Sequence, residues 1–163
     1  MTETAVKNRA LLDSYVELIN EKISEKAIVE SYINEPNFHL PTIIVDKKEW
    51  LGLAELLKSG DEFKFDFLMN LSGVDYVEYM EVIYHLYSYE RDQYLAVKVQ
   101  TERDGGSVAS VIDVWRTADW QEREVYDLLG IGFTGREISR ILLPDDWVGY
   151  PLRKDYVMPE EEV

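Results

Sequence analysis

The chain has 163 residues and a net charge of −15, from 32 acidic and 17 basic residues. A chain this acidic is repelled by nucleic-acid phosphates and by anionic lipid, so any membrane contact should run through another protein. It has no cysteine, which excludes disulfides, thiolate-bound zinc and cysteine-ligated iron–sulfur clusters within the chain. Hydrophobic residues make up 46%, enough for a packed core, but the apolar runs are too short to span a bilayer. The polar N-terminus lacks the apolar stretch of a secretory signal. The absence of disulfides agrees with a cytoplasmic location.

The first third of the chain predicts a helix and then two strands. Between residue 6 or 8 and Ile23, apolar side chains recur at helical spacing along one stripe. Residues 26–33 alternate in polarity and residues 38–45 carry β-branched side chains, with a proline-containing turn between them.

A second helix is predicted to begin at Asp46, because Glu49 follows at the spacing of a capping box. Val45 and Trp50 flank this start and can form a hydrophobic staple. Gly60 is placed to end the helix.

The middle of the chain has a strong β pattern. Residues 63–76 fit a buried strand or a short helix, whereas 81–89 and 93–100 predict a hairpin closed by a short loop. Residues 102–107 predict a turn and 108–115 a further strand. The hairpin places three side chains in the core: Leu95, Val97 and Val99. We therefore expect an α+β fold, with a largely antiparallel or mixed sheet and helices packed on it.

A short third helix is predicted over residues 120–129. Asp119 and Glu122 repeat the capping-box spacing at its start, and Gly130 is placed to close it. Its expected apolar face consists of Val125, Leu128 and Leu129.

Two acidic residues of this helix, Glu124 and Asp127, are expected to share a flank with Trp120, while Arg123 lies one turn before Asp127. An acid pair beside an arginine could be a catalytic dyad or half of a metal site. The alternative is a network of ion pairs that fixes the helix against a neighbour. We favour the network, because no third catalytic group stands nearby.

Residues 131–163 contain glycine and proline and show no helical or strand period. Such a segment cannot bury large apolar side chains by itself, so it either folds back on its own domain or lies across a partner. We expect docking on a partner rather than a disordered tail. The predicted division is an α+β core domain over 1–130 and an extended docking arm over 131–163. The large anchors of the arm are Ile141, Leu142, Leu143, Trp147, Leu152 and Tyr156.

The sequence shows few motifs or residues typical of a catalytic site. There is no Gly-x-Gly-x-x-Gly fingerprint and no phosphate-binding loop. The two histidines, His39 and His85, fall in predicted strands far apart in sequence, and we interpret both as ordinary strand residues.

From about Ser107 to Tyr156 the sequence closely resembles the thirty-kilodalton subunit family of respiratory complex I, which supplies the C subunit of bacterial NADH-quinone oxidoreductase. The resemblance rests on a Glu-Arg-Glu motif, an acid three residues later, an apolar pair, and a basic residue before an aliphatic run. One position departs: Arg136 stands where the family usually has histidine, so no role that needs an imidazole there carries over. The signature and expected docking positions are Glu122, Arg123, Glu124, Asp127, Gly130, Phe133, Arg140, Leu142, Pro144, Asp145, Asp146, Trp147, Pro151, Leu152, Arg153, Lys154, Asp155 and Tyr156.

The resemblance implies a cofactor-free docking subunit of the hydrophilic arm of a proton-translocating NADH-quinone oxidoreductase. FMN, iron–sulfur clusters and quinone would be bound by partner subunits, and no catalytic, cofactor or metal residue is expected in this chain. The implied partners are the large quinone-site subunit of the forty-nine-kilodalton type and small iron–sulfur subunits, on the cytoplasmic side of the cell membrane.

Three alternatives remain open at this point. The equivalent subunit of a related membrane-bound hydrogenase or coenzyme-F420 dehydrogenase complex fits the sequence equally well. A stand-alone hydrolase that uses Glu124 and Asp127, or a free-standing binding module, belongs to a different class of protein.

Overall fold

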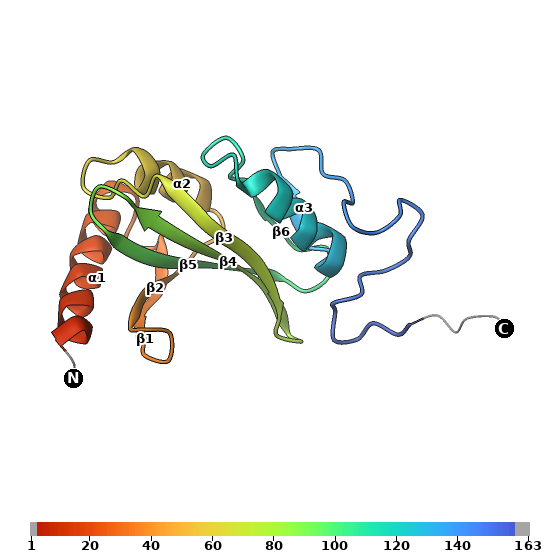
Figure 1. Ribbon diagram of the computed structural model, residues 1–163, viewed down its shortest axis with the longest axis horizontal. Coiled ribbons are helices and arrows are strands. Elements are labelled where there is room, and N and C mark those ends of the chain that lie inside the picture. Colours follow the sequence, from red (N-terminus) through yellow and green to blue (C-terminus); the bar gives the residue numbers. More distant parts are fainter. Residues whose placement is uncertain (1–2, 159–163) are drawn as a thin grey trace.

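The computed structural model describes residues 3–158, which form a five-stranded sheet covered by helices and a two-stranded ribbon beside it (Figure 1). The elements in chain order are α1 (Glu3–Lys22), β1 (Ile28–Asn34), β2 (Leu40–Val45), α2 (Trp50–Ser59), β3 (Phe67–Asp75), β4 (Tyr79–Ser88), β5 (Gln93–Glu102), β6 (Ser107–Ala109), α3 (Ala118–Leu129) and β7 (Gly132–Thr134). The large sheet has the order β1-β2-β5-β4-β3, and only β2 and β5 run parallel. The predicted α+β fold with a mixed sheet is confirmed.

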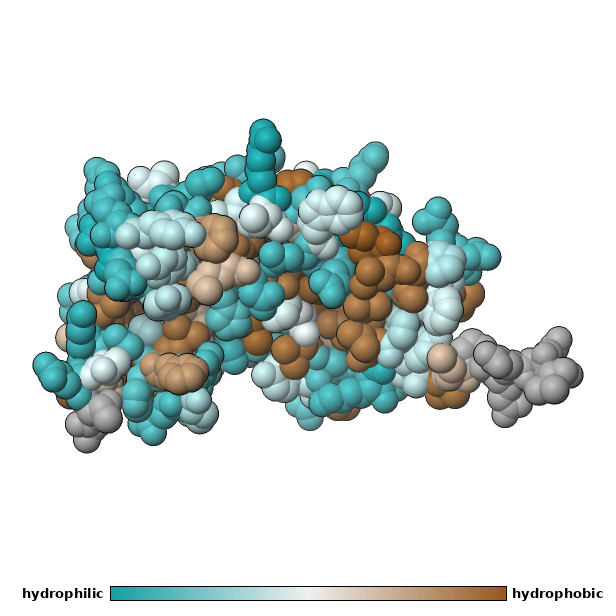
Figure 2. Space-filling model, viewed as in Figure 1, coloured by the Kyte–Doolittle hydropathy of each residue, from teal (hydrophilic) through white to brown (hydrophobic). Residues whose placement is uncertain are grey.

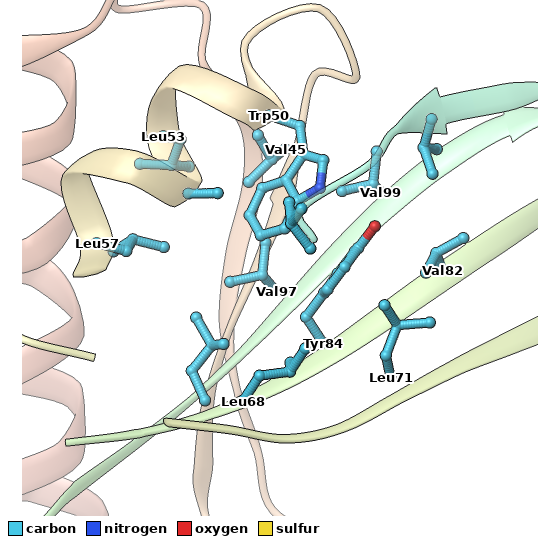
Figure 3. Close-up of a cluster of buried hydrophobic side chains, with 14 of the residues drawn as sticks. Val45, Trp50, Leu53, Leu57, Leu68, Leu71, Val82, Tyr84, Val97 and Val99 are labelled. Atoms are coloured by element: carbon cyan, nitrogen blue, oxygen red, sulfur yellow. The ribbon is translucent and has the colours of Figure 1, made fainter. Parts of the chain in front are cut away.

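The core lies between one face of the large sheet and the helices. Trp50 of α2 packs on Tyr84 of β4, with 4.4 Å between ring centroids, beside Val97 and Val99 of β5 (Figure 3). Burying an aliphatic side chain of this kind contributes about 1.5–3 kcal/mol. The predicted core positions of the hairpin, Leu95 included, are all buried.

Helix α1 uses the predicted stripe to cover the β1–β2 end of the sheet. Leu12, Tyr15 and Ile19 are buried, and the Tyr15 ring lies 5.2 Å from that of Phe63. The helix begins at Glu3, earlier than expected.

The predicted capping box at the start of α2 is wrong. The Asp46 carboxylate accepts the N–H of Lys48, and the Asp46 carbonyl accepts the N–H of Glu49, so these residues form a turn. The helix therefore begins at Trp50, without a side-chain cap from Glu49. Gly60 follows the last turn as predicted. Val45 and Trp50 belong to the same buried cluster, but with the helix beginning at Trp50 they do not occupy the two positions of a hydrophobic staple.

One open assignment is decided and three others change. Residues 63–76, left open, contain β3, and His39 lies in the β1–β2 turn with φ 55° rather than in a strand. The strand expected over 108–115 is wrong beyond Ala109, because the carbonyl of Val111 accepts the N–H groups of Val114 and Trp115 in a tight turn. The expected absence of strands after residue 130 is also wrong, since β7 pairs parallel with β6.

The outer edge of the large sheet is covered by α3, which fixes the place of the candidate site. The side chain of Gln121 accepts the N–H of Leu71 on β3, so an edge donor is satisfied. Gly73 allows the close approach: a Cβ there would lie 2.6 Å from Leu129 and 2.9 Å from Val125. The segment that follows α3, by which we mean residues 135–158 beyond β7, runs back along this helix at the opposite end of the molecule from α1 (Figure 1).

Candidate docking site at helix α3 and the segment that follows it

Glu122 is buried beneath α3, where it joins the helix to the β6 connection. Its carboxylate accepts hydrogen bonds from the hydroxyl of Ser110 at 2.7 Å and the N–H of Val111 at 2.8 Å. The predicted capping box with Asp119 is therefore wrong; Thr117 occupies the N-cap position. The spacing of Asp119 and Glu122 is compatible with a capping box or with a Glu122 side chain that points away from the helix start. The hydrogen bonds from Ser110 and Val111 correspond to the second arrangement.

Arg136 neutralises this buried acid. One guanidinium nitrogen lies 3.2 Å from the Glu122 carboxylate and another 2.5 Å from that of Asp119. Burial raises the pKa of Glu122, and the hydrogen bonds from Ser110, Val111 and Arg136 lower it only in part. At the position where the family usually has histidine, this chain thus supplies a permanent cation.

Asp127 binds the segment that follows α3 through both of its oxygens. Oδ2 accepts three successive backbone N–H groups, those of residues 141, 142 and 143, at 3.0, 2.7 and 2.9 Å. Oδ1 accepts the guanidinium of Arg140 at 2.8 Å. Burial acts to raise the pKa of Asp127, but these donors outweigh it and lower the pKa to about 2. Asp127 is therefore an ionised anchor at neutral pH.

The expected common flank of Glu124 and Asp127 is wrong. Glu124 is exposed whereas Asp127 is fully buried, so the two carboxylates do not meet. Within residues 3–158 no cluster of three or more potential metal-ligating side chains occurs. The dyad that a carboxylate-dependent hydrolase would need is not formed, and the ion-pair network is what the geometry provides.

The same segment caps the C-terminal end of α3. A helix leaves its last carbonyl groups without internal donors, and here each of the last four finds one. The pairs are the Gly130 N–H to Tyr126, Arg140 to Asp127, the Leu152 N–H to Leu128, and Arg153 to Leu129. Two of the donors are arginines, whose charge also suits the negative end of the helix dipole.

Tyr150 fills the space between those two arginines. The guanidinium carbons of Arg140 and Arg153 lie 5.2 and 5.0 Å from its ring centroid, within cation–π distance. The ring also packs against Gly130, where φ is 74° and a Cβ would lie 2.6 Å from it. A side chain at position 130 would displace this ring.

A second anchor holds the far end of the segment. The Asp75 carboxylate at the end of β3 accepts the guanidinium of Arg103 and the N–H of Lys154, the latter at 2.9 Å. The hydrogen bond from Arg103 is the main cause of a strongly lowered Asp75 pKa. Arg103 also pairs with Asp155 at 2.8 Å. The segment is thus fixed near its start, at 140–143, and near its end, at 153–155.

Some of the expected docking residues are held within the chain itself, and others are exposed to solvent. Phe133 is buried in the core, and Arg123 donates to the Arg140 carbonyl at 2.9 Å, so neither is free to dock. Leu142 and Leu152 are 62% and 60% exposed, and Asp145 is exposed. Figure 2 shows apolar side chains gathered over this end of the molecule, bordered by hydrophilic ones. Also exposed are Pro144, Asp146 and Lys154, while Pro151, Trp147 and Tyr156 are half-buried.

Sequence reasoning missed Asp75, Arg103 and Tyr150. No local pattern could have found Asp75, because it meets Lys154 across 79 positions of sequence. The last residues of the expected arm, 159–163, lie outside the described part of the chain.

An α+β domain with a C-terminal segment tied down by buried carboxylates has the features of a structural, partner-binding domain. The sequence matches the family described as respiratory-chain NADH dehydrogenase, 30 Kd subunit, over residues 43–162. The chain belongs to this family. The resemblance noted in the sequence is confirmed.

Two relatives illustrate the match. The C subunit of NADH-quinone oxidoreductase from Chlorobium phaeobacteroides is 43% identical over 121 residues, 72% of this chain and 73% of the relative. The C subunit of the same enzyme from Geotalea uraniireducens is 34% identical over 170 residues, 99% of this chain and 96% of the relative.

Two solved structures share the fold. A chain of the membrane-bound sulfane sulfur reductase, an archaeal respiratory membrane complex, superposes with a TM-score of 0.72 at 25% identity, covering 90% of this chain and 85% of that one. The trypsin-resistant fragment of Nqo5 gives 0.60 at 25% identity, covering 75% and 97%.

Proposed function

We propose that this chain is the C subunit of an NADH-quinone oxidoreductase and acts there as a structural, docking subunit. The support is the family membership together with relatives of that name at 34–43% identity, one of them matched over 96% of its length. Electrons from NADH pass through FMN and iron–sulfur clusters to quinone in the partner subunits, and this chain positions those partners.

The alternative of a related membrane-bound hydrogenase or coenzyme-F420 dehydrogenase complex is less well supported, because the relatives described above are subunits of NADH-quinone oxidoreductase. A chain of the sulfane sulfur reductase complex shares the fold at 25% identity, below the identity of the two NADH-quinone oxidoreductase relatives. The proposed partners are the large quinone-site subunit and the small iron–sulfur subunits. Within residues 3–158, none of the helices combines the length and apolar character needed to cross a membrane. We propose that this chain is held peripherally, on the cytoplasmic side.

The observation that carries the docking role is the orientation of the segment after α3. Its arginines and the backbone N–H groups of residues 141–143 turn inward to the helix, whereas Leu142, Val148 and Leu152 are 62%, 83% and 60% exposed. Exposed aliphatic side chains on a fixed backbone offer a partner apolar area at little cost in ordering entropy.

The test is a triple substitution, Leu142→Ser, Val148→Ser and Leu152→Ser, in the chain expressed with its complex. We expect loss of co-purification of the large subunit, because each change removes apolar area from the contact. Unchanged thermal unfolding of the isolated chain would show that folding is retained.

The matched control replaces three exposed aliphatic side chains elsewhere by serine: Val6, Val29 and Leu51. This control variant should retain the large subunit. If the first triple variant retained it equally well, the docking role of the segment would be refuted.

Deletion after Gly130, although it follows the proposed division into core and arm, is a poorer test. It removes Ile131 and Phe133 from the core, and it removes the arginines that neutralise Glu122 and Asp127. Loss of the partner would then reflect an unfolded chain.

A further inference from the structure

Four arginines around α3 and the segment after it turn inward, whereas Arg116, just before the helix, is exposed. Arg136, Arg140 and Arg153 have side chains only 12%, 13% and 15% exposed, and Arg103 is 15% exposed. Each is engaged by a carboxylate of the chain itself. These cations are therefore not available to a partner.

The acidic side chains of the same region turn outward. Glu124, Glu137, Asp145 and Asp146 are all exposed, and none of them forms an ion pair within residues 3–158. Among residues 131–158, Lys154 is the one exposed basic side chain. The local surface is thus more acidic than the residue count of the segment suggests.

Exposed apolar side chains lie among these acids. Trp120 of α3 is 63% exposed and stands one turn from Glu124, while Leu142, Val148 and Leu152 project from the segment. Figure 2 shows the resulting mixture of apolar and hydrophilic side chains over this end of the molecule. We call it the acidic–apolar surface: Trp120, Glu124, Glu137, Leu142, Asp145, Asp146, Val148 and Leu152.

We propose that the acidic–apolar surface binds a protein surface of opposite charge, in which lysine or arginine side chains surround aliphatic or aromatic contacts. This inference rests on the proposed function and specifies the chemistry of the partner. Unpaired carboxylates at the rim of an apolar contact speed association and favour a basic partner. A second copy of this chain would bring the same charge and be repelled, as would anionic lipid.

The test uses the purified full-length chain and membranes from a strain that lacks its gene. Binding is measured by co-sedimentation at NaCl concentrations from about 50 mM to about 500 mM, where screening shortens from beyond 10 Å to a few ångströms. We expect the apparent Kd to rise about tenfold or more over this range.

The double variant Asp145→Lys, Asp146→Lys reverses two exposed charges that form no ion pair within residues 3–158, so its folding should be intact. We expect its Kd to rise about tenfold at low salt. The matched control, Glu17→Lys with Glu21→Lys on α1, makes the same change of charge at the opposite end of the molecule and should bind like the wild type.

The outcomes separate the two proposals. If the Kd changed neither with salt concentration nor with the Asp145→Lys, Asp146→Lys reversal, the proposal of a basic partner would be overturned, while the proposal of docking would stand. Wild-type chain that fails to bind these membranes at every salt concentration would overturn both. Equal binding to protein-free phosphatidylglycerol vesicles, or self-association in sedimentation equilibrium, would overturn the basic partner in favour of lipid or a second copy.

Discussion

Replacing Asp127 by asparagine tests whether one carboxylate holds the segment to α3. The pKa of Asp127 is lowered from 3.8 to about 2, and each unit corresponds to about 1.36 kcal/mol, so the ionised form contributes roughly 2–3 kcal/mol. The variant also leaves the guanidinium of Arg140 without its counter-charge. We expect Asp127→Asn to lower the free energy of unfolding by about 3 kcal/mol, a fall of roughly 6–12 °C in Tm for a chain of this size.

Two measurements check this expectation. Urea unfolding gives the global loss, and hydrogen exchange at the amides of residues 141–143 reports the local release of the segment. Because the folded pKa lies below the ordinary value of 3.8, the stabilisation is complete above that pH and is lost as the pH falls through about 2. The difference between wild type and Asp127→Asn should therefore shrink between those limits.

The matched control is Asp145→Asn, which removes an exposed carboxylate from the same segment. It should change the free energy of unfolding by less than about 0.5 kcal/mol. The anchoring role is refuted if Asp127→Asn behaves like this control and the amides of residues 141–143 keep their protection.

Three further substitutions test the rest of the site. Burial raises the Glu122 pKa above 4.5, so wild type loses stability as the pH rises from that value towards the folded pKa. The free energy of unfolding of Glu122→Gln relative to wild type, measured in urea, should therefore increase with pH over this range. Gly73→Val brings a side chain against Leu129 and should lose about 1–3 kcal/mol in thermal unfolding, with altered near-ultraviolet circular dichroism. Tyr150→Leu removes two cation–π contacts and should lose about 1–2 kcal/mol in urea unfolding; no change would show that the ring is a bystander.

The elements that could be predicted from sequence are those in which apolar residues recur at a regular spacing because one face of the helix or strand is buried. The hairpin of β4 and β5 and the stripe of α1 are of this kind. The strand expected over 108–115 failed because Val111, Val114 and Trp115 are buried by a turn whose spacing does not alternate. A run of apolar residues alone does not distinguish a buried strand from a buried turn.

The site was predictable in composition but not in geometry. The acids and arginines of the signature were identified, yet the direction of each carboxylate depends on backbone donors that lie elsewhere in the sequence. Glu122 and an ordinary capping acid have the same local spacing, and the inward direction of Glu122 is set by the donors of Ser110, Val111 and Arg136. Asp75 could not be predicted as an anchor for the same reason, because Lys154, which donates to it, lies 79 residues away in the sequence.

Polar anchoring explains how an irregular segment can be both ordered and available. A segment without helix or strand lacks partners for its own N–H groups, while the end of α3 lacks donors for its carbonyls, and each supplies what the other needs. Had apolar burial fixed the segment instead, Leu142 and Leu152 would be hidden in the isolated chain. Because directional hydrogen bonds set the backbone in advance, a partner need not order it, and the apolar side chains remain for the contact. Loss of Asp127 should therefore weaken docking even though this buried side chain presents nothing to a partner.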